Sequence, residues 1–185
     1  MRTRRLLGTV VMVGTLVLAA CGGVGGGTGS APAQGGGDAS PQAGGGTGAP
    51  TPAALDFTVA TVDGGTFDGA DLAGGPAVLW FWAPWCVVCA GQAAEVSALA
   101  QEYDGRAAVV GVAGLDGSVD AMRDFVARTG VAGLVHLADV DGVVWRRFGI
   151  TAQSTFVVLD RTGAVVARDL PGPEQVREWL PQVTG

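Results

Sequence analysis

The chain of 185 residues contains little of several kinds of side chain, and each shortage excludes a class of function. It has only 11 basic residues, all of them Arg, against 17 acidic ones, and its net charge is −6. Because a nucleic-acid-binding protein needs a basic surface, we expect no nucleic-acid partner. His136 is the only histidine, and the chain has three cysteines with no second closely spaced pair. A zinc site is therefore disfavoured, and we expect neither a metal nor a cofactor.

No apolar run reaches the length of a comfortable transmembrane helix, which needs roughly 18 to 20 apolar residues. Residues 1–20 instead have the pattern of a targeting segment, with three arginines in the first five positions and an uncharged, mostly apolar stretch over residues 6–20. The segment ends in Leu-Ala-Ala-Cys at residues 18–21, which resembles a bacterial lipobox. In that motif the signal is cut before the cysteine, and the cysteine then carries a lipid.

Cys21 is accordingly the predicted lipidation site, and the alternative is an ordinary secretory signal whose cleavage site happens to adjoin a cysteine. Lipidation is favoured because it leaves Cys86 and Cys89 as a self-contained pair rather than leaving an odd thiol in an exported protein. Residues 22–53 are almost entirely Gly, Ala, Ser, Thr, Pro and Gln, with no aromatic residue and one charge. We expect residues 21–53 to be a disordered tether and residues 54–185 to be the folded domain.

The hydrophobic pattern of the folded part predicts alternating strands and helices. The helix after Cys86 is expected to reach about Tyr103, with one apolar line at Val87, Ala90, Ala94 and Ala98 and a second at Val88, Val96 and Leu99. The order of the expected strands and helices along the chain is that of one small α/β domain with a mixed central sheet. The expected strands are residues 57–62, 66–67, 77–82, 107–112, 134–137, 155–159 and 164–168, and the other expected helices begin near residues 118, 141 and 173.

The chemistry of the sequence is concentrated where the strand over residues 77–82 ends at Ala83-Pro84 and a helix begins. Cys86 would lie at the helix N-terminus, where unpaired N–H groups and the helix dipole favour its thiolate. Cys89 would lie one turn further along and be more buried. We therefore predict that Cys86 is the nucleophile and that Cys89 resolves its mixed disulfides. A purely structural disulfide is less expected, because a bridge across two residues closes almost no loop.

The stretch Trp-Ala-Pro-Trp-Cys-Val-Val-Cys at residues 82–89 resembles the active-site motif of thioredoxin-like proteins. The added hairpin before the central strand, and the stretch over residues 148–163, resemble the exported TlpA/ResA/DsbE branch. The resemblance implies a thioredoxin-like fold, a central mixed sheet flanked by helices with an added N-terminal β-hairpin, in a bacterial lipoprotein of actinobacterial type. It also implies thiol–disulfide exchange with proteins, with substrate contacts at Pro84, Trp85, Gln153, Ser154 and Thr155.

Two positions depart from the family pattern. Where the family usually has a cis-proline before the third core strand, this chain has Ser154, and a cis bond before a non-proline residue costs about 2.5 to 4 kcal/mol. We expect either a trans bond with altered loop geometry or a strained cis bond. Where thioredoxins carry a buried Asp six residues before the first cysteine, this chain has Trp80, so that position supplies no carboxylate. Glu95 is expected to face solvent, and His136 to be a packed or surface residue rather than a catalytic one.

The predicted function is that of an extracytoplasmic thiol–disulfide oxidoreductase, anchored to the outer face of the cytoplasmic membrane through lipid on Cys21. We expect a monomer with a membrane redox partner. The direction of exchange stays open, because the resemblance covers both reductases of cytochrome c maturation and oxidases of secreted proteins. A peroxiredoxin is disfavoured because Ala83 stands where that chemistry needs a threonine. The alternative outside enzymes is a non-catalytic, lipid-anchored binding module that kept the fold.

Overall fold

The structure is a computed structural model that describes residues 52–116 and 118–185. The predicted signal segment, Cys21 and nearly all of the predicted tether lie outside these residues. In the described part of the chain, no helix is long and apolar enough to span a membrane.

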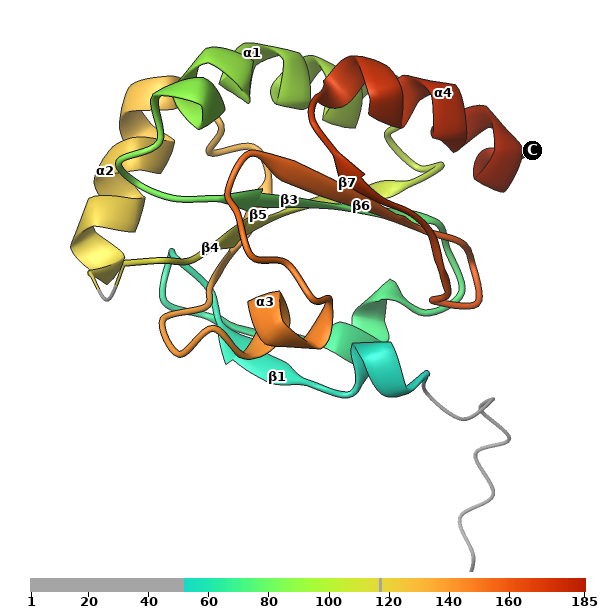
Figure 1. Ribbon diagram of the computed structural model, residues 1–185, viewed down its shortest axis with the longest axis horizontal. Helices are drawn as coiled ribbons and strands as arrows, with labels where there is room; N and C mark the ends of the chain where they lie inside the picture. Colours follow the sequence, from blue (N-terminus) through green and yellow to red (C-terminus); the bar gives the residue numbers. More distant parts are fainter. Residues whose placement is uncertain (1–51, 117) are drawn as a thin grey trace, which may run out of the picture. The chain divides into compact units, whose positions relative to one another are not determined.

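A five-stranded sheet forms the centre of the fold, with the strand order β5-β4-β3-β6-β7 (Figure 1). Strands β3, β4 and β5 run parallel, β6 pairs antiparallel with β3 on its other side, and β7 pairs antiparallel with β6, so the predicted mixed sheet is confirmed. Every residue of β3 is buried, which is the pattern of a strand covered on both faces. The bounds are β3 Ala77–Trp82, β4 Ala108–Ala113, β5 Val135–Ala138, β6 Thr155–Leu159 and β7 Val165–Leu170.

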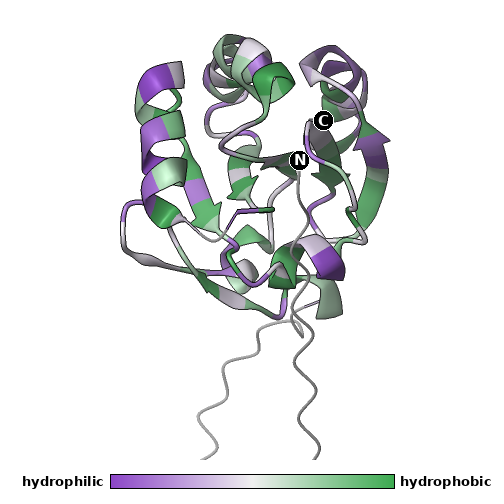
Figure 2. Cartoon of the chain, turned by 60° about the vertical axis from the view of Figure 1, so that its left-hand side comes forward, coloured by the Kyte–Doolittle hydropathy of each residue, from purple (hydrophilic) through white to green (hydrophobic). Residues whose placement is uncertain are grey.

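The side chains of β3 alternate between two hydrophobic cores. Val78, Trp80 and Trp82 face the core under α1, α2 and α4, while the residues between them face the core under α3 and the N-terminal hairpin. Figure 1 shows these helices in two layers on opposite sides of the sheet, and in Figure 2 the strands between the layers are mostly green, or hydrophobic. The helix bounds are α1 Val87–Glu102, α2 Val119–Thr129, α3 Val143–Arg147 and α4 Pro173–Thr184.

The predicted hairpin before the central strand is present as a separate two-stranded sheet of β1, Thr58–Ala60, and β2, Thr66–Asp68. Thr61, just after β1, makes one isolated antiparallel bridge to Leu137 in β5. Short 3-10 turns flank the hairpin at Ala53–Leu55 and Gly69–Leu72.

The burial of α1 corrects one detail of the sequence analysis. The residues Val87, Ala90, Ala94 and Ala98 are exposed, and so is Val88. The buried face consists of Cys89, Ala93, Val96 and Leu99, which recur at the helical spacing of three and four residues. The expected line at Val87 was wrong because this helix carries small or apolar residues on nearly all its sides, so composition did not identify the side that packs on the sheet.

Candidate active site

The cysteine pair lies where β3 passes into α1. The chain turns at Ala83–Trp85, and the Cys86 N–H closes this turn by donating to the Ala83 carbonyl at 3.0 Å. Cys86 is the N-cap of α1 and keeps an extended backbone, with φ −78° and ψ 108°. Cys89 follows within the first turn, and the two residues form a disulfide with a Cα–Cα separation of 5.3 Å. The strand end and the helix start therefore bring both sulfurs to one point.

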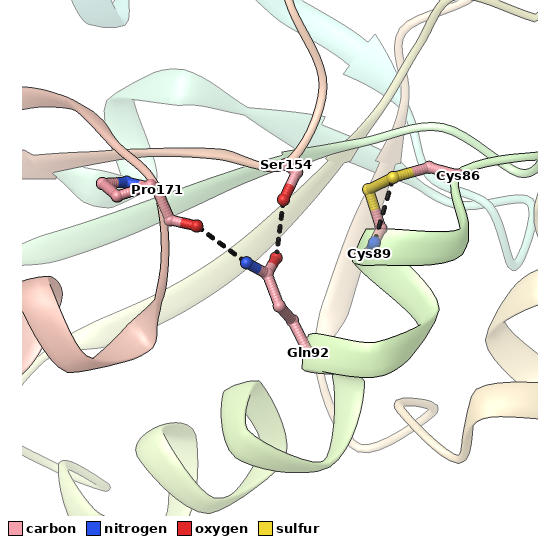
Figure 3. Close-up of a disulfide and its surroundings, with 5 residues drawn as sticks. All are labelled: Cys86, Cys89, Gln92, Ser154 and Pro171. Atoms are coloured by element: carbon pink, nitrogen blue, oxygen red, sulfur yellow. Dashed lines mark hydrogen bonds between the residues drawn. A yellow bond between two sulfur atoms is a disulfide. The ribbon is translucent and has the colours of Figure 1, made fainter.

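The Sγ atom of Cys86 faces the start of the helix. It accepts a hydrogen bond from the Cys89 N–H at 3.0 Å, as an N-cap side chain does (Figure 3). Once the disulfide is reduced, the same N–H and the positive end of the helix dipole would stabilise a thiolate on Cys86. Cys86 is 5% exposed and Cys89 is fully buried, so Cys86 is the sulfur that an incoming group reaches first.

Three exposed apolar residues adjoin the cysteines in the chain, and a fourth is hydrogen-bonded to one of them; we call this set the apolar rim: Trp85, Val87, Val88 and Leu115. Val87 is 85% exposed and Trp85 is 55% exposed. The Trp85 indole N–H donates to the Leu115 carbonyl at 3.4 Å, which links the turn before α1 to the segment after β4. Leu115 has φ 57°, in the left-handed region that non-glycine residues seldom adopt. Sequence reasoning identified Trp85 but missed Leu115, for which no local pattern gives a signal.

Two other residues singled out in the motif are buried rather than exposed. Pro84 is buried in the turn before the disulfide, and Trp82 is fully buried in the core beneath it. Trp82 therefore belongs wholly to the core and not to the rim.

Ser154 lies in the loop that faces the disulfide (Figure 3). No peptide bond of the described residues is cis, so of the two expected conformations the loop has the trans form. Ser154 has φ 63°, its N–H donates to the Phe81 carbonyl at 2.8 Å, and its hydroxyl donates to Oε1 of Gln92 at 3.0 Å. Gln153 and Thr155 on either side are half-buried. The loop that faces the cysteines is therefore tied both to β3 and to α1.

Aromatic side chains fill the space behind the site. Trp80 and Trp82 of β3 pack against each other with ring centroids 5.9 Å apart, and Trp82 stacks on Phe125 of α2 at 4.2 Å. Phe156 stacks on Trp80 from the neighbouring strand at 6.2 Å, and the His136 ring meets the Trp82 ring edge-on at 5.5 Å. Position 80 therefore supplies an apolar wall where a carboxylate would hold or move a proton.

His136 is buried in this aromatic cluster, so of the two expected positions, packed or on the surface, it has the packed one. Its Nε2 lies 2.9 Å from the Val131 carbonyl, which can only accept, so Nε2 carries the proton of the neutral ring. Its Nδ1 has no partner among the described residues. Burial lowers the pKa of His136, while the Val131 hydrogen bond and the charge of Asp63 act in the opposite direction. His136 is therefore a neutral packing residue at neutral pH.

Glu95, further along α1, is exposed as expected. In residues 52–116 and 118–185, no three His, Cys, Asp or Glu side chains gather in a way that could hold a metal ion.

A disulfide-bonded cysteine pair at the start of α1, a mixed sheet in the order β5-β4-β3-β6-β7 and helices on both faces define a protein of the thioredoxin-like fold. The chain belongs to the AhpC/TSA family, whose model matches residues 50–168. The predicted thioredoxin-like fold, including the added hairpin, is thereby confirmed.

Among characterised sequences, the chain is similar to the soluble secreted antigen MPT53 of Mycobacterium tuberculosis and Mycobacterium bovis. This chain is 42% identical to either antigen over 103 residues, which cover 56% of this chain and 58% of the antigen. The match thus spans a little over half the length of these relatives.

Solved structures extend the match over the folded part. The chain is 41% identical to dsbF of MTB, which was solved in mixed oxidized and reduced forms, with a TM-score of 0.67 over 72% of this chain and 99% of that one. It is 33% identical to a secreted Mycobacterium tuberculosis disulfide oxidoreductase described as homologous to Escherichia coli DsbE, with a TM-score of 0.62 over 70% and 97% of the two chains. A protein from Chlorobium tepidum, 23% identical with a TM-score of 0.65, shares the fold.

Proposed function

We propose that this protein exchanges disulfides with other proteins through Cys86 and Cys89, outside the cytoplasmic membrane. The observation that carries the proposal is the position of the Cys86 sulfur at the N-terminus of α1, beside an exposed apolar rim. The similarity to a secreted disulfide oxidoreductase supports it.

The geometry supports one sequence of steps. A substrate thiolate attacks Sγ of Cys86, the Cys86–Cys89 bond breaks, and Cys89 leaves as a thiolate that takes up a proton. The second substrate thiol then attacks the substrate sulfur of the mixed disulfide and releases the Cys86 thiolate. Two electrons pass to the protein and the substrate gains a disulfide, while one proton is held on Cys89 and the other is released to solvent because Cys86 is left as a thiolate. The same steps in reverse reduce a substrate disulfide, with Cys89 attacking Cys86 to release the product.

The apolar rim favours cysteines that lie in apolar or unfolded segments of a substrate. Trp85, Val87 and Val88 offer contact area on one side of the disulfide, and burying such area drives association. Gln153, Ser154 and Thr155 would supply polar and backbone contacts on the other side. A substrate chain between the two would bring its sulfur to Cys86.

The direction of exchange follows from the reduction potential of the pair. Val87 and Val88 between the cysteines add no charge that would stabilise a thiolate, which favours an intermediate or reducing potential. An exported protein works in an oxidising compartment, which favours oxidation of substrates. Equilibration with glutathione buffers measures the potential directly. A value near −270 mV would indicate a reductase that needs a membrane electron donor, as in cytochrome c maturation, and one near −120 mV an oxidase.

We also propose that residues 1–20 are a signal peptide, that lipid on Cys21 anchors the protein to the outer face of the cytoplasmic membrane, and that residues 21–53 are a tether for the domain over residues 54–185. A lipid anchor would keep the domain at the membrane while a tether lets it reach substrates. The test is the Cys21→Ser variant expressed in a bacterial host. It should appear in the medium or the soluble fraction, whereas the parent protein stays with the membrane, and membrane retention of the variant would contradict the anchor.

The proposed exchange activity has a direct test in both directions. The protein should accelerate the reduction of insulin by dithiothreitol, or the oxidation of reduced ribonuclease, and the Cys86→Ser variant should do neither. A chain inactive in both assays would instead be a binding module. Peroxide consumption is not expected, because Ala83 beneath the disulfide carries no hydroxyl to activate a peroxide.

A further inference from the structure

Gln92 connects α1 to two loops, the one before β6 that contains Ser154 and the one after β7 that contains Pro171. It lies on α1, three residues after Cys89, and is half-buried. Its Nε2 donates to the Pro171 carbonyl at 2.7 Å, and its Oε1 accepts from the Ser154 hydroxyl at 3.0 Å. Figure 3 shows the Gln92 side chain extending from α1 between Ser154 and Pro171. A single amide group thus links three segments that are far apart in the sequence.

The chemistry of the partners fixes the orientation of this amide. The Pro171 carbonyl can only accept a hydrogen bond, so the NH₂ group of Gln92 must face it. The carbonyl oxygen of Gln92 is then left to accept from Ser154. Both ends of the amide are therefore used, and neither glutamate nor a shorter side chain reproduces both contacts.

The contact matters most at Ser154. Its φ of 63° lies in the left-handed region, which a residue with a side chain adopts only when its surroundings hold it there. The backbone hydrogen bond to Phe81 holds one side of the residue, and the bond to Gln92 holds the hydroxyl. Gln92 thus stabilises the loop that stands opposite the cysteines.

We propose that Gln92 is a positioning residue that holds the Ser154 loop and the Pro171 turn in the geometry that receives a substrate chain. This proposal rests on the exchange function proposed above. The side-chain hydrogen bonds of Gln92 go to Ser154 and Pro171 and not to a sulfur atom, so it acts on docking and not on the sulfur chemistry. A loop that is already in its binding conformation loses less conformational entropy when a substrate binds, so the substrate binds more tightly.

The test compares two dithiols that reduce the same disulfide. One is dithiothreitol, which has no peptide chain to dock, and the other is a synthetic unfolded peptide with two cysteines. Reduction of Cys86–Cys89 is followed by tryptophan fluorescence in stopped flow over a range of dithiol concentrations. The variants are Gln92→Met, which keeps the length of the side chain and removes both hydrogen bonds, and Gln92→Glu, which keeps only the acceptor for Ser154. Gln101→Met, an exposed position further along α1, is the matched control.

In Gln92→Met the half-saturating peptide concentration should rise about three- to tenfold, the factor that corresponds to loss of the one bond, to Ser154, that holds the loop at the cysteines. The maximal rate and the rate with dithiothreitol should stay as in the parent protein. The half-saturating peptide concentration of Gln92→Glu should lie between those of the parent protein and Gln92→Met, and that of Gln101→Met should match the parent.

An unchanged half-saturating concentration in Gln92→Met would overturn the positioning role while leaving the exchange function intact. So would an equal slowing with dithiothreitol, since Gln92 would then act on the disulfide itself. If the parent protein is reduced by dithiothreitol and not by the peptide, the exchange function fails, and the role of Gln92 fails with it.

Discussion

Gly111 in β4 allows the aromatic cluster beneath the active site to close. Phe156, Trp80, Gly111 and His136 are cross-strand partners in one row across β6, β3, β4 and β5. A Cβ atom at position 111 would overlap Nδ1 of His136 and would lie 2.8 Å from Nε1 of Trp82. A glycine is therefore required here for space, not for an unusual backbone angle.

Replacement of Gly111 by alanine should destabilise the fold. Overpacking a close-packed core costs about 1–3 kcal/mol, and the rings around this position have little room to move. Gly91 is the matched control, because it is exposed on α1 and nothing lies within 4 Å of the Cβ position. Gly91→Ala should stabilise the fold by about 0.5–1 kcal/mol. Urea denaturation measures both, and a loss of stability that is equal in the two variants would contradict the packing argument.

The buried His136 should make the fold sensitive to mild acid. Because burial lowers its pKa below the ordinary value of 6.5, the unfolded chain takes up a proton before the folded chain does. Its share of stability is complete above about pH 7 and is lost as pH falls through 6.5 toward the lowered pKa, by at most about 1.4 kcal/mol per pH unit. The pKa of Asp63 nearby is lowered from 3.8 by its bonds to Thr61 and Gly65, so its titration lies below this window.

The measurement is the free energy of unfolding between about pH 7.5 and 5, in the parent protein and in His136→Phe. The comparison uses the slope with pH, so a uniform loss of stability in the variant does not affect it. The parent should lose stability toward pH 5 and the variant should lose less. Equal slopes would show that His136 takes up its proton as readily in the folded state as in the unfolded one.

At the level of the elements, the start of α3 depends on one buried carboxylate. Asp139 is 1% exposed and follows directly after β5. Its two oxygens accept the N–H groups of Val143 and Trp145 at 2.7 and 2.8 Å. These donors belong to the first turn of α3, where a helix has no internal acceptors for them. The carboxylate therefore joins β5 to α3, the helix that covers the core on the same side of the sheet as the N-terminal hairpin.

Asp139→Ala should cost about 2–3 kcal/mol, since it removes two charge-assisted hydrogen bonds and leaves the buried Trp145 N–H without an acceptor. Asp141→Ala is the control, because Asp141 is an exposed aspartate two residues away. Thermal unfolding measures both variants. If the two are equally stable, the carboxylate of Asp139 does not hold the helix start.

Most elements were predictable from the sequence because their signals are local. The strand over residues 155–159 was predicted with its observed bounds, and a helix was expected to begin near residue 118, where α2 begins. Ser118 accepts the Ala121 N–H, and Gly130 has φ 73°. The buried face of α1 was not predictable, because its apolar residues surround the helix and only the tertiary fold selects one side.

The candidate site divides in the same way. Cys86 and Cys89 were identifiable because a Cys-x-x-Cys after a buried strand has a recognisable spacing. Gln92, Leu115 and Pro171 were not, because each acts through a partner distant in the sequence, as in the Gln92 bond to Pro171. The replacement of proline by Ser154 was visible, but its hydroxyl bond to α1 required the folded chain.

Over the whole molecule, the parts relate to one function. The folded domain holds a nearly buried disulfide at the start of α1, with the exposed side chains of the apolar rim next to it in the chain and the Ser154 loop near it in Figure 3. The proposed lipid at Cys21 and the proposed tether would hold that domain at the outer face of the cytoplasmic membrane. The central claim is that Cys86 attacks and is attacked, while Cys89 releases the partner.

Trapping of mixed disulfides tests that claim most directly. Cys89→Ser keeps the reactive sulfur of Cys86 and lacks the thiol that would release a bound partner. Expressed in a bacterial host and quenched with acid, Cys89→Ser should carry proteins in disulfide-linked complexes. These complexes should be visible on a non-reducing gel and absent after treatment with dithiothreitol. Cys86→Ser should carry few or none, because its remaining sulfur is buried. Complexes on Cys86→Ser and none on Cys89→Ser would reverse the assigned roles, and none on either would contradict the exchange function.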